Sequence, residues 1–177
     1  RRPQSAVVHY LDGLVKQQEK DLRGAAAAFE TAVEIDSEFP GANAALGEVL
    51  ASLGDTAGAS RALERAVELG EGGAAASFNM GVVLSQKNRH REAIPHLERA
   101  VELDPQMKDA YRALGTAYRQ VDDFAAAADA YQKLIDRFGP DARDLYQLAF
   151  AQAKVDRHRD AAQNFSMVAG LQPDNWR

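Results

Sequence analysis

The side chains that could perform chemistry are few, and the histidines are the first to consider. His90 and His96 are six residues apart on a predicted helix, so they face different directions, and His9 is isolated in the sequence. His158 occurs in a later segment that resembles the surroundings of His90, too far away to share a metal ion with it. Cysteine is absent, which removes thiolate ligands and disulfides. We therefore predict surface histidines and no metal site.

Paired glutamates are the second candidate, because two carboxylates can serve as general acid and general base. Three pairs have i,i+4 spacing: Glu30/Glu34, Glu64/Glu68 and Glu98/Glu102. Residues at this spacing share one helix face, and like charges beside solvent are typical of an exposed surface. The sequence also lacks a phosphate-binding loop and the GxSxG and HExxH motifs. We predict no catalytic activity and no cofactor for this chain; a catalytic domain elsewhere in a longer protein is compatible with this.

The glutamate pairs belong to an internal repeat. Leu63–Leu69 and Leu97–Leu103 have the same sequence, LERAVEL, at an offset of 34 residues. Asn88–Ala93 (NRHREA) returns as Asp156–Ala161 (DRHRDA) at twice that offset. Further positions are in register without any insertion. A small residue recurs as Gly13, Gly47, Gly81, Gly115 and Ala149. Alanine recurs as Ala25, Ala59, Ala93, Ala127 and Ala161, and a bulky residue as Phe29, Leu63, Leu97, Tyr131 and Phe165. A period of this length is typical of stacked helix pairs.

These positions make the sequence resemble the tetratricopeptide repeat family. Five units fit this pattern, and together they cover nearly the whole chain: 6–39, 40–73, 74–107, 108–141 and 142–175. The resemblance implies an all-α fold, a right-handed superhelical solenoid of five tandem 34-residue helix-turn-helix repeats in one array over residues 1–177. The large aromatic residue that usually stands near the start of each unit is replaced, except in the fourth. The residues at this position are His9, Asn43, Ser77, Tyr111 and Leu145.

Each unit is expected to form two antiparallel helices. The first helices are predicted at about 7–19, 41–53, 75–87, 109–121 and 143–155. The second helices are predicted at about 23–36, 57–69, 91–104, 125–138 and 159–171. A turn signal follows each first helix: Lys20-Asp21, Gly54-Asp55, Asn88-Arg89, Asp122-Asp123 and Asp156-Arg157. The glycine-rich segment at 70–73 is predicted to be the loosest joint, because glycine loses the most backbone entropy on ordering.

The resemblance places first helices on the inside of the solenoid, where such folds bind their partners. The predicted groove residues in the N-terminal half are mainly apolar: Tyr10, Leu11, Leu14, Phe78, Asn79 and Val82. Those in the C-terminal half are basic or aromatic: Arg112, Arg119, Arg143, Tyr146, Phe150 and Lys154. We expect a partner peptide with apolar and acidic side chains. The alternative is ordinary exposed surface. The chaperone-tail clamp known in this family is not expected, since of its lysine and asparagine positions only Asn79 fits.

Composition narrows the choice of partner. The formal net charge is −5, whereas proteins that bind nucleic acid without sequence preference are usually basic over the contact face. No apolar run approaches the roughly 20 residues that span a bilayer. The sequence does not begin with methionine, which is compatible with a processed product or with a piece of a longer protein. The sequence does not determine the cellular compartment. It is compatible with the cytoplasm and, after removal of a signal sequence, with the periplasm.

Three functions fit these observations. The first is a non-catalytic adaptor that binds a protein or peptide partner in the groove. The second is the repeat arm of a larger enzyme, because such arrays accompany glycosyl- and sulfotransferases. The third is a scaffold of a secretion or envelope assembly, a homo-oligomer formed through its terminal helices. The fold alone does not choose among them, because this family shares a scaffold and not a ligand.

Overall fold

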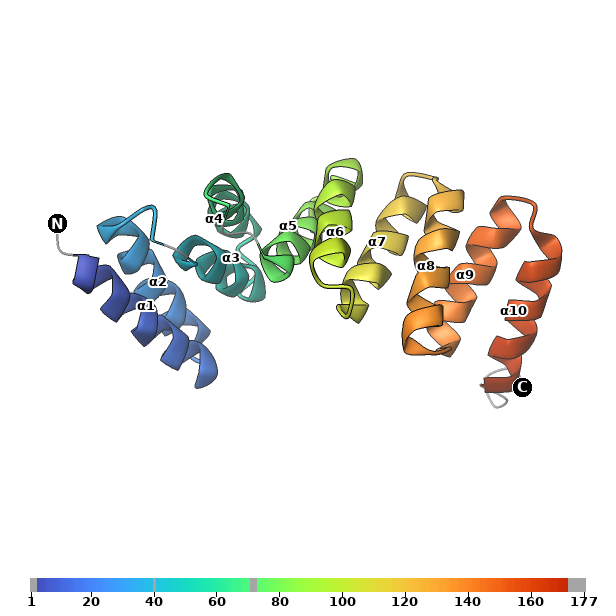
Figure 1. Cartoon of the computed structure of the whole chain (residues 1–177), viewed down its shortest axis with the longest axis horizontal. Helices are drawn as coiled ribbons and strands as arrows, with labels where there is room; N and C mark the ends of the chain where they lie inside the picture. Colours follow the sequence, from blue (N-terminus) through green and yellow to red (C-terminus); the bar gives the residue numbers. More distant parts are fainter. Residues whose placement is uncertain (1–2, 40, 71–72, 172–177) are drawn as a thin grey trace. The chain divides into compact units, whose positions relative to one another are not determined.

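The computed structural model describes residues 3–39, 41–70 and 73–171, and all regular secondary structure in these ranges is α-helical (Figure 1). The first helices of the repeats are α1 (Pro3–Gln18), α3 (Ala42–Ser52), α5 (Ala74–Gln86), α7 (Lys108–Gln120) and α9 (Ala142–Lys154). The second helices are α2 (Leu22–Ile35), α4 (Thr56–Glu68), α6 (His90–Leu103), α8 (Phe124–Phe138) and α10 (His158–Leu171). The predicted all-α repeat of helix pairs is confirmed. Apart from the earlier start of α1, the helix ends lie close to their predicted positions.

The turn inside each helix pair contains one residue in the left-handed region. These residues are Lys20, Gly54, Asn88, Asp122 and Asp156, with φ between 59° and 81°. In three repeats the aspartate that follows caps the second helix. The carboxylates of Asp21, Asp55 and Asp123 accept hydrogen bonds from backbone N–H groups at 2.9, 2.9 and 3.0 Å. Each cap satisfies a donor that the helix itself leaves unpaired. The turn signals of the sequence therefore end one helix and begin the next.

The small residues of the repeat allow the two helices of a pair to approach closely. A Cβ atom on Gly13 would lie 2.5 Å from the ring of Phe29, and one on Gly115 would lie 2.8 Å from the ring of Tyr131. These separations are shorter than carbon atoms tolerate, so glycine is required by the packing of the pair. The recurring alanines of the second helices also allow this close approach. Four of them are fully buried: Ala25, Ala59, Ala93 and Ala127.

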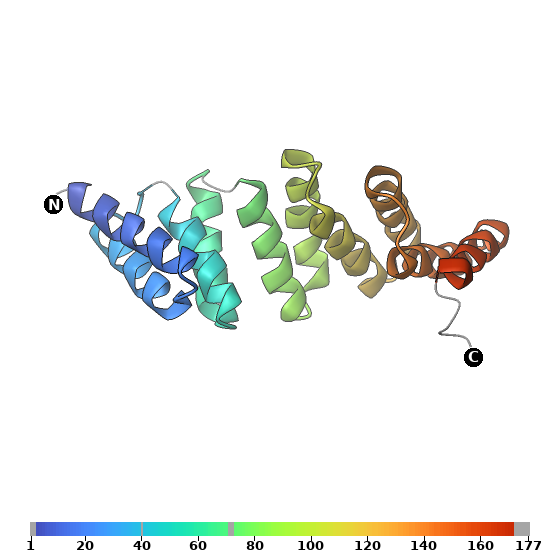
Figure 2. The same cartoon turned by 90° about the horizontal axis from the view of Figure 1, so that it is seen from below.

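The chain divides into two compact units, residues 1–89 and residues 90–177. In unit 1, α2 packs on α3, α4 packs on α5, and α3 also contacts α5. In unit 2, α6 packs on α7 and α8 packs on α9. Figure 2 shows the paired helices of each unit side by side, from α1 and α2 in blue to α10 in red. The division falls between α5 and α6, inside the third predicted repeat. Residues 71 and 72 of the predicted loose joint lie outside the described residues.

The core of unit 2 illustrates how consecutive repeats pack. Its buried cluster joins Ala128, Tyr131 and Leu134 of α8 to Leu148 and Ala151 of α9. Side chains of a second helix therefore pack against the first helix of the next repeat. None of the described helices is both long and apolar enough to cross a membrane.

Candidate functional site

In unit 1 the predicted groove residues lie on two first helices. Leu11 and Leu14 of α1 are exposed, whereas Phe78, Asn79 and Val82 of α5 are half-buried. Figure 1 shows α3 between these two helices. Unit 1 thus offers apolar side chains on α1 and α5, separated by α3.

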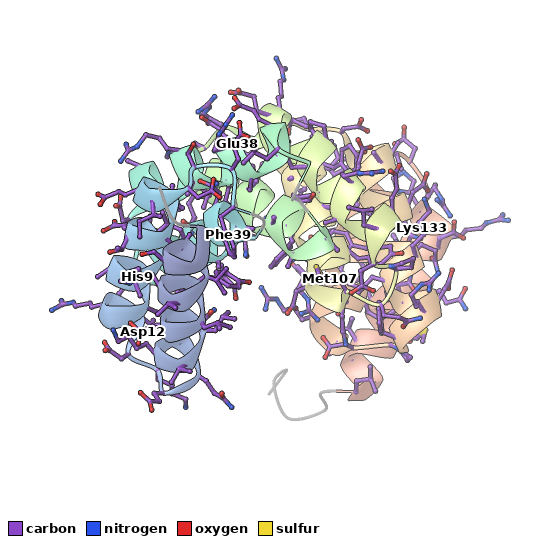
Figure 3. The ribbon with its side chains drawn as sticks, turned by 60° about the vertical axis from the view of Figure 1, so that its left-hand side comes forward. His9, Asp12, Glu38, Phe39, Met107 and Lys133 are labelled. Atoms are coloured by element: carbon purple, nitrogen blue, oxygen red, sulfur yellow. The ribbon has the colours of Figure 1, made fainter. Side chains whose placement is uncertain are left out.

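Tyr10, the remaining predicted residue of this unit, packs inside its own repeat. Its ring centroid lies 5.7 Å from that of Phe29 and 5.3 Å from that of Phe39. Phe39 belongs to the turn after α2 and is labelled in Figure 3. Tyr10 is half-buried, so its contribution to any ligand contact is limited to the edge that these rings leave uncovered.

In unit 2 the first basic residue already has a partner. Arg112 of α7 donates from Nε and Nη2 to the two carboxylate oxygens of Asp144 in α9, both at 2.8 Å. The side chain of Asp144 is 1% exposed. A third hydrogen bond runs from Nη1 to the exposed Asp109 at 3.0 Å. Hydrogen bonding to Asp144 raises the pKa of Arg112, so the guanidinium keeps its charge. Arg112 therefore joins two consecutive first helices, and most of its donors are used.

The other basic residues of the predicted groove differ from Arg112. In the described part of the chain, no ion pair forms to Arg119, Arg143 or Lys154. Arg143 is exposed at the start of α9, and the half-buried Arg119 has an Nε atom without a hydrogen-bond partner. A guanidinium without a carboxylate partner can bind an incoming carboxylate with two parallel hydrogen bonds.

Aromatic rings lie beside one of these cations, Lys154. The Lys154 Nζ atom is 5.5 Å from the ring centroid of Phe150 and 5.8 Å from that of Phe124, within cation–π range. Tyr146, which is exposed, meets the edge of Phe165 with centroids 5.6 Å apart. These contacts fix the orientation of the rings before any ligand arrives. We define Arg119, Arg143, Tyr146, Phe150 and Lys154 as the basic-aromatic surface.

A hydrogen-bonded chain supports α7 beneath this surface. The hydroxyl of Thr116 donates to the carbonyl oxygen of Arg112 at 2.8 Å. Its only hydrogen is then engaged, so the hydroxyl of Tyr131 donates to Thr116 Oγ1 at 2.9 Å. Burial raises the pKa of Tyr131, which keeps that hydroxyl protonated as a donor. These two hydrogen bonds link the backbone of α7 at Arg112 to Tyr131 in the core of unit 2.

Sequence reasoning missed Asp144 and Phe124. A signal for Asp144 was present. At the same repeat position the other units have Val8, Ala42, Ala76 and Ala110. An acid in an otherwise apolar column implies a partner, because an unpaired buried carboxylate is costly. Phe124 stands at a position where the repeat pattern carries no information, so only the structure places it against Lys154.

A cavity of about 810 Å³ lies on the second-helix side of unit 2, away from the predicted groove residues. Its apolar floor includes Val101, Tyr111 and Leu114, and its rim includes the glutamate pair Glu98/Glu102. The hydroxyl of Tyr118 donates to Glu98 at 2.5 Å, and burial raises the pKa of that tyrosine. Glu98 is therefore a hydrogen-bond acceptor. In the described residues, no group of three His, Asp or Glu side chains has the arrangement of a metal site.

A smaller cavity of about 260 Å³ occupies the equivalent place in unit 1, between α2, α3 and α4. It is lined by the equivalents of the same positions, among them Glu30, Leu46 and Leu50. The two cavities are therefore formed by equivalent positions of the repeat, one in each unit.

Comparisons with known proteins agree on the family and the fold. The sequence profile of the tetratricopeptide repeat family matches residues 10–74, 44–108 and 78–143, in steps that follow the repeat. No protein in the curated set matches the sequence. Among solved structures, a crystal structure of MamA is 22% identical with a TM-score of 0.86, covering 97% of this chain and 94% of that one. YrrB, described as a TPR protein with an unusual peptide-binding site, is 21% identical with a TM-score of 0.87, covering 96% and 87%. MamA from Desulfovibrio magneticus RS-1, from residue 41 to its end, is 24% identical with a TM-score of 0.81, covering 98% of each chain.

Proposed function

The chain belongs to the tetratricopeptide repeat family, and from this premise we propose that it is a non-catalytic protein-interaction module. The first helices are the elements that bind in this proposal. The partner is a peptide or protein segment with apolar and acidic side chains. The basic-aromatic surface of unit 2 binds acidic side chains. Within unit 1, taken by itself, Leu11, Leu14, Phe78 and Val82 bind apolar side chains.

The observation that carries this proposal is the unequal pairing of the basic residues on unit 2. Arg112 is held by Asp144, so it serves the contact between repeats. Arg119 and Arg143 have no carboxylate partner in the described chain. Together with Lys154, which lies beside the half-buried rings of Phe124 and Phe150, they place positive charge on unit 2 of a protein whose net charge is −5. Such a surface attracts a carboxylate by charge and offers the rings as contact area at small entropic cost.

The similarity to YrrB is consistent with this proposal, since that protein has a peptide-binding site by description. At 21% identity it supports the fold of the module and not the choice of ligand. The preference for acidic peptides rests on Arg119, Arg143 and Lys154 of this chain alone.

The test uses a defined probe, a fluorescently labelled peptide of glutamate, leucine and phenylalanine, measured by fluorescence anisotropy. We expect the wild-type protein to bind it and the same peptide with lysine in place of glutamate to bind at least tenfold more weakly, a difference of about 1.4 kcal/mol. Binding should also weaken as salt rises, because the Debye length is about 8 Å at physiological ionic strength. The variant Arg119→Glu/Arg143→Glu should lose binding.

The matched control is Arg91→Glu/Arg159→Glu, which makes the same change in net charge. Both residues are exposed on second helices of unit 2, away from the basic-aromatic surface. This control should bind as the wild type does. Equal loss in both double variants would mean that overall charge, and not this surface, attracts the peptide. Unchanged binding by Arg119→Glu/Arg143→Glu would refute the proposed site.

A further inference from the structure

The cavity of about 810 Å³ in unit 2 is formed by three consecutive helices, and we call it the outer cavity. Its floor is α7, which packs on α6 and on α8 and lies between them in Figure 1. The floor residues are Tyr111, Leu114 and Tyr118, with Val101 of α6 beside them. On both sides of this segment the sequence continues with further repeat helices, α5 and α9.

Two contacts identify the two ends of the outer cavity. The hydroxyl of Tyr118 donates to Oε1 of Glu98 at 2.5 Å, so these two residues lie at the end next to the turn between α7 and α8. The ring centroid of Tyr111 lies 6.1 Å from that of Phe138, at the last residue of α8. The late residues of α8 therefore lie at the Tyr111 end, and its early residues lie at the Tyr118 end.

The two ends differ in charge. The charged lining residues at the Tyr118 end are Glu98 and Asp129, both acidic and both exposed. Within the described residues, no ion pair forms to Asp129. At the Tyr111 end two acids are matched by two bases, one of which, Lys133, is labelled in Figure 3. These four residues are Glu102, Asp136, Lys133 and Arg137. Negative charge is therefore left unbalanced at the Tyr118 end.

The smaller cavity of unit 1 lacks this arrangement. Glu30 and Arg61 occupy the positions of Glu98 and Asp129 there, so its two sides carry opposite charges. Leu50 replaces Tyr118. Across the array the position of Asp129 holds no other acid, and the residues are Ala27, Arg61, Pro95 and Gln163. Packing of the repeats therefore does not require an acid at this position.

The shape of the outer cavity favours a helical ligand. Its α8 lining runs from Ala126 to Arg137, about 16 Å along the axis at about 1.5 Å per residue, or about three helical turns. All of its lining residues belong to helices, whose backbone groups are already hydrogen-bonded within each helix. An extended peptide would find no strand edge to pair with there, whereas a helix satisfies its own backbone and presents one apolar stripe.

We propose that the outer cavity of unit 2 binds an amphipathic helix of a partner protein, about three turns long, with lysine or arginine side chains at one end. The apolar stripe of that helix packs on Val101, Leu114 and Tyr118. Its cationic end lies beside Glu98 and Asp129.

The chemistry of the Tyr118 end suits such a cation. A carboxylate has two oxygens, and the hydrogen bond from Tyr118 to Glu98 engages Oε1, so Oε2 can accept from an ammonium or guanidinium group. The half-buried ring of Tyr118 can add a cation–π contact. This interaction goes beyond the proposed function, because it uses the second-helix side and a ligand of the opposite charge. It includes no residue of the basic-aromatic surface.

The probe is a fluorescently labelled peptide of about 14 residues, made of alanine, leucine and lysine. Its leucines have i, i+4, i+7 spacing, and its lysines lie in one terminal turn. Fluorescence anisotropy at physiological salt should show binding to the wild-type protein. The same peptide with glutamine in place of lysine should bind at least tenfold more weakly. A scrambled peptide of the same composition should also bind at least tenfold more weakly, as should any lysine peptide without this helical spacing.

Three variants locate the site. Asp129→Arg copies the charges of the unit 1 cavity and should bind the probe at least tenfold more weakly. Glu98→Gln, which keeps an acceptor for Tyr118, should also weaken binding. Tyr118→Leu introduces the residue that equivalent positions have in Leu50 and Leu84, so it should fold normally and bind more weakly. Circular dichroism should show unchanged helicity in all three.

The matched control is Glu34→Arg, which makes the same change in net charge as Asp129→Arg. Glu34 is an exposed acid of the second helix α2, and it lines neither cavity. This control should bind the probe as the wild type does. Equal loss in the two variants would mean that overall charge attracts the peptide, and the proposed site would be wrong.

Three further results would overturn the proposal. These are a wild-type protein that does not bind the probe, an Asp129→Arg variant that binds it as tightly as the wild type, and a scrambled peptide that binds equally well. Binding of acidic peptides to the basic-aromatic surface is measured with a different probe and different variants. Failure of either proposal would therefore leave the test of the other unaffected.

Discussion

Arg112 lies between two aspartates of very different exposure. Asp144 is buried and receives two hydrogen bonds, whereas the Asp109 side chain is 74% exposed and receives one. A buried carboxylate without its partner is strongly unfavourable, and a solvated pair contributes little. Arg112 therefore contributes to the stability of the fold mainly through its contact with Asp144. This contact links α7 to α9.

This difference gives a prediction at the scale of the residue. Arg112→Leu should destabilise unit 2 by about 3 kcal/mol, because it leaves the carboxylate of Asp144 buried and unpaired. Asp109→Ala should cost less than about 1 kcal/mol. Urea denaturation of the full chain measures both. If Asp109→Ala were as costly as Arg112→Leu, the bidentate contact with Asp144 would not be the stabilising one. The double variant Arg112→Leu/Asp144→Leu should recover part of the loss, since it removes both charges together.

At the scale of the helix, two of the alanines of α8 lie in different environments. Ala127 is fully buried, whereas Ala125 is exposed at the start of the same helix. Alanine and leucine have similar helix propensity, so the effect of replacing either one depends on packing. The repeat register assigns Ala127 to the column of close helix approach.

Ala127→Leu should therefore destabilise the protein by roughly 1–3 kcal/mol through overpacking. Ala125→Leu, the matched control, should leave the thermal midpoint nearly unchanged. Differential scanning calorimetry of the two variants measures the difference. An unchanged midpoint for Ala127→Leu would show that the register of the fourth repeat is wrong.

The helices could be predicted well because their signals are local and repeated. The left-handed turn residues Asn88 and Asp122, and the glycines opposite Phe29 and Tyr131, follow from residue type and spacing. The site could be predicted less fully. The pairing of Arg112 with Asp144 joins residues in consecutive repeats, and a column of apolar residues gives no partner for a lone acid until the helices are in place. The outer cavity was missed because only its glutamates were considered, without the floor of Val101 and Leu114.

At the scale of the whole molecule, the division into units does not follow the repeats. The predicted boundaries between repeats on either side of the division fall at residues 73 and 107, whereas unit 1 extends to Arg89 and includes α5. The physical reason is the packing of α5, which contacts both α3 and α4 of the second repeat. In repeat proteins the stability is close to a sum of units and of contacts between neighbours. Whether a fragment of unit 1 retains α5 should therefore decide how stable that fragment is.

Two fragments that differ only in α5 test this reasoning. The fragment 1–89 keeps α5 on α3 and α4, and the fragment 1–73 removes α5 together with these contacts. We expect 1–89 to unfold at higher urea concentration and with a steeper transition, because more apolar surface is buried and exposed together. Circular dichroism at increasing urea measures both quantities, with the fragment 90–177 as the counterpart for unit 2. If 1–89 and 1–73 had the same midpoint and slope, α5 would add helix without cooperative packing. Unit 1 would then end with the second repeat, at a boundary between predicted repeats.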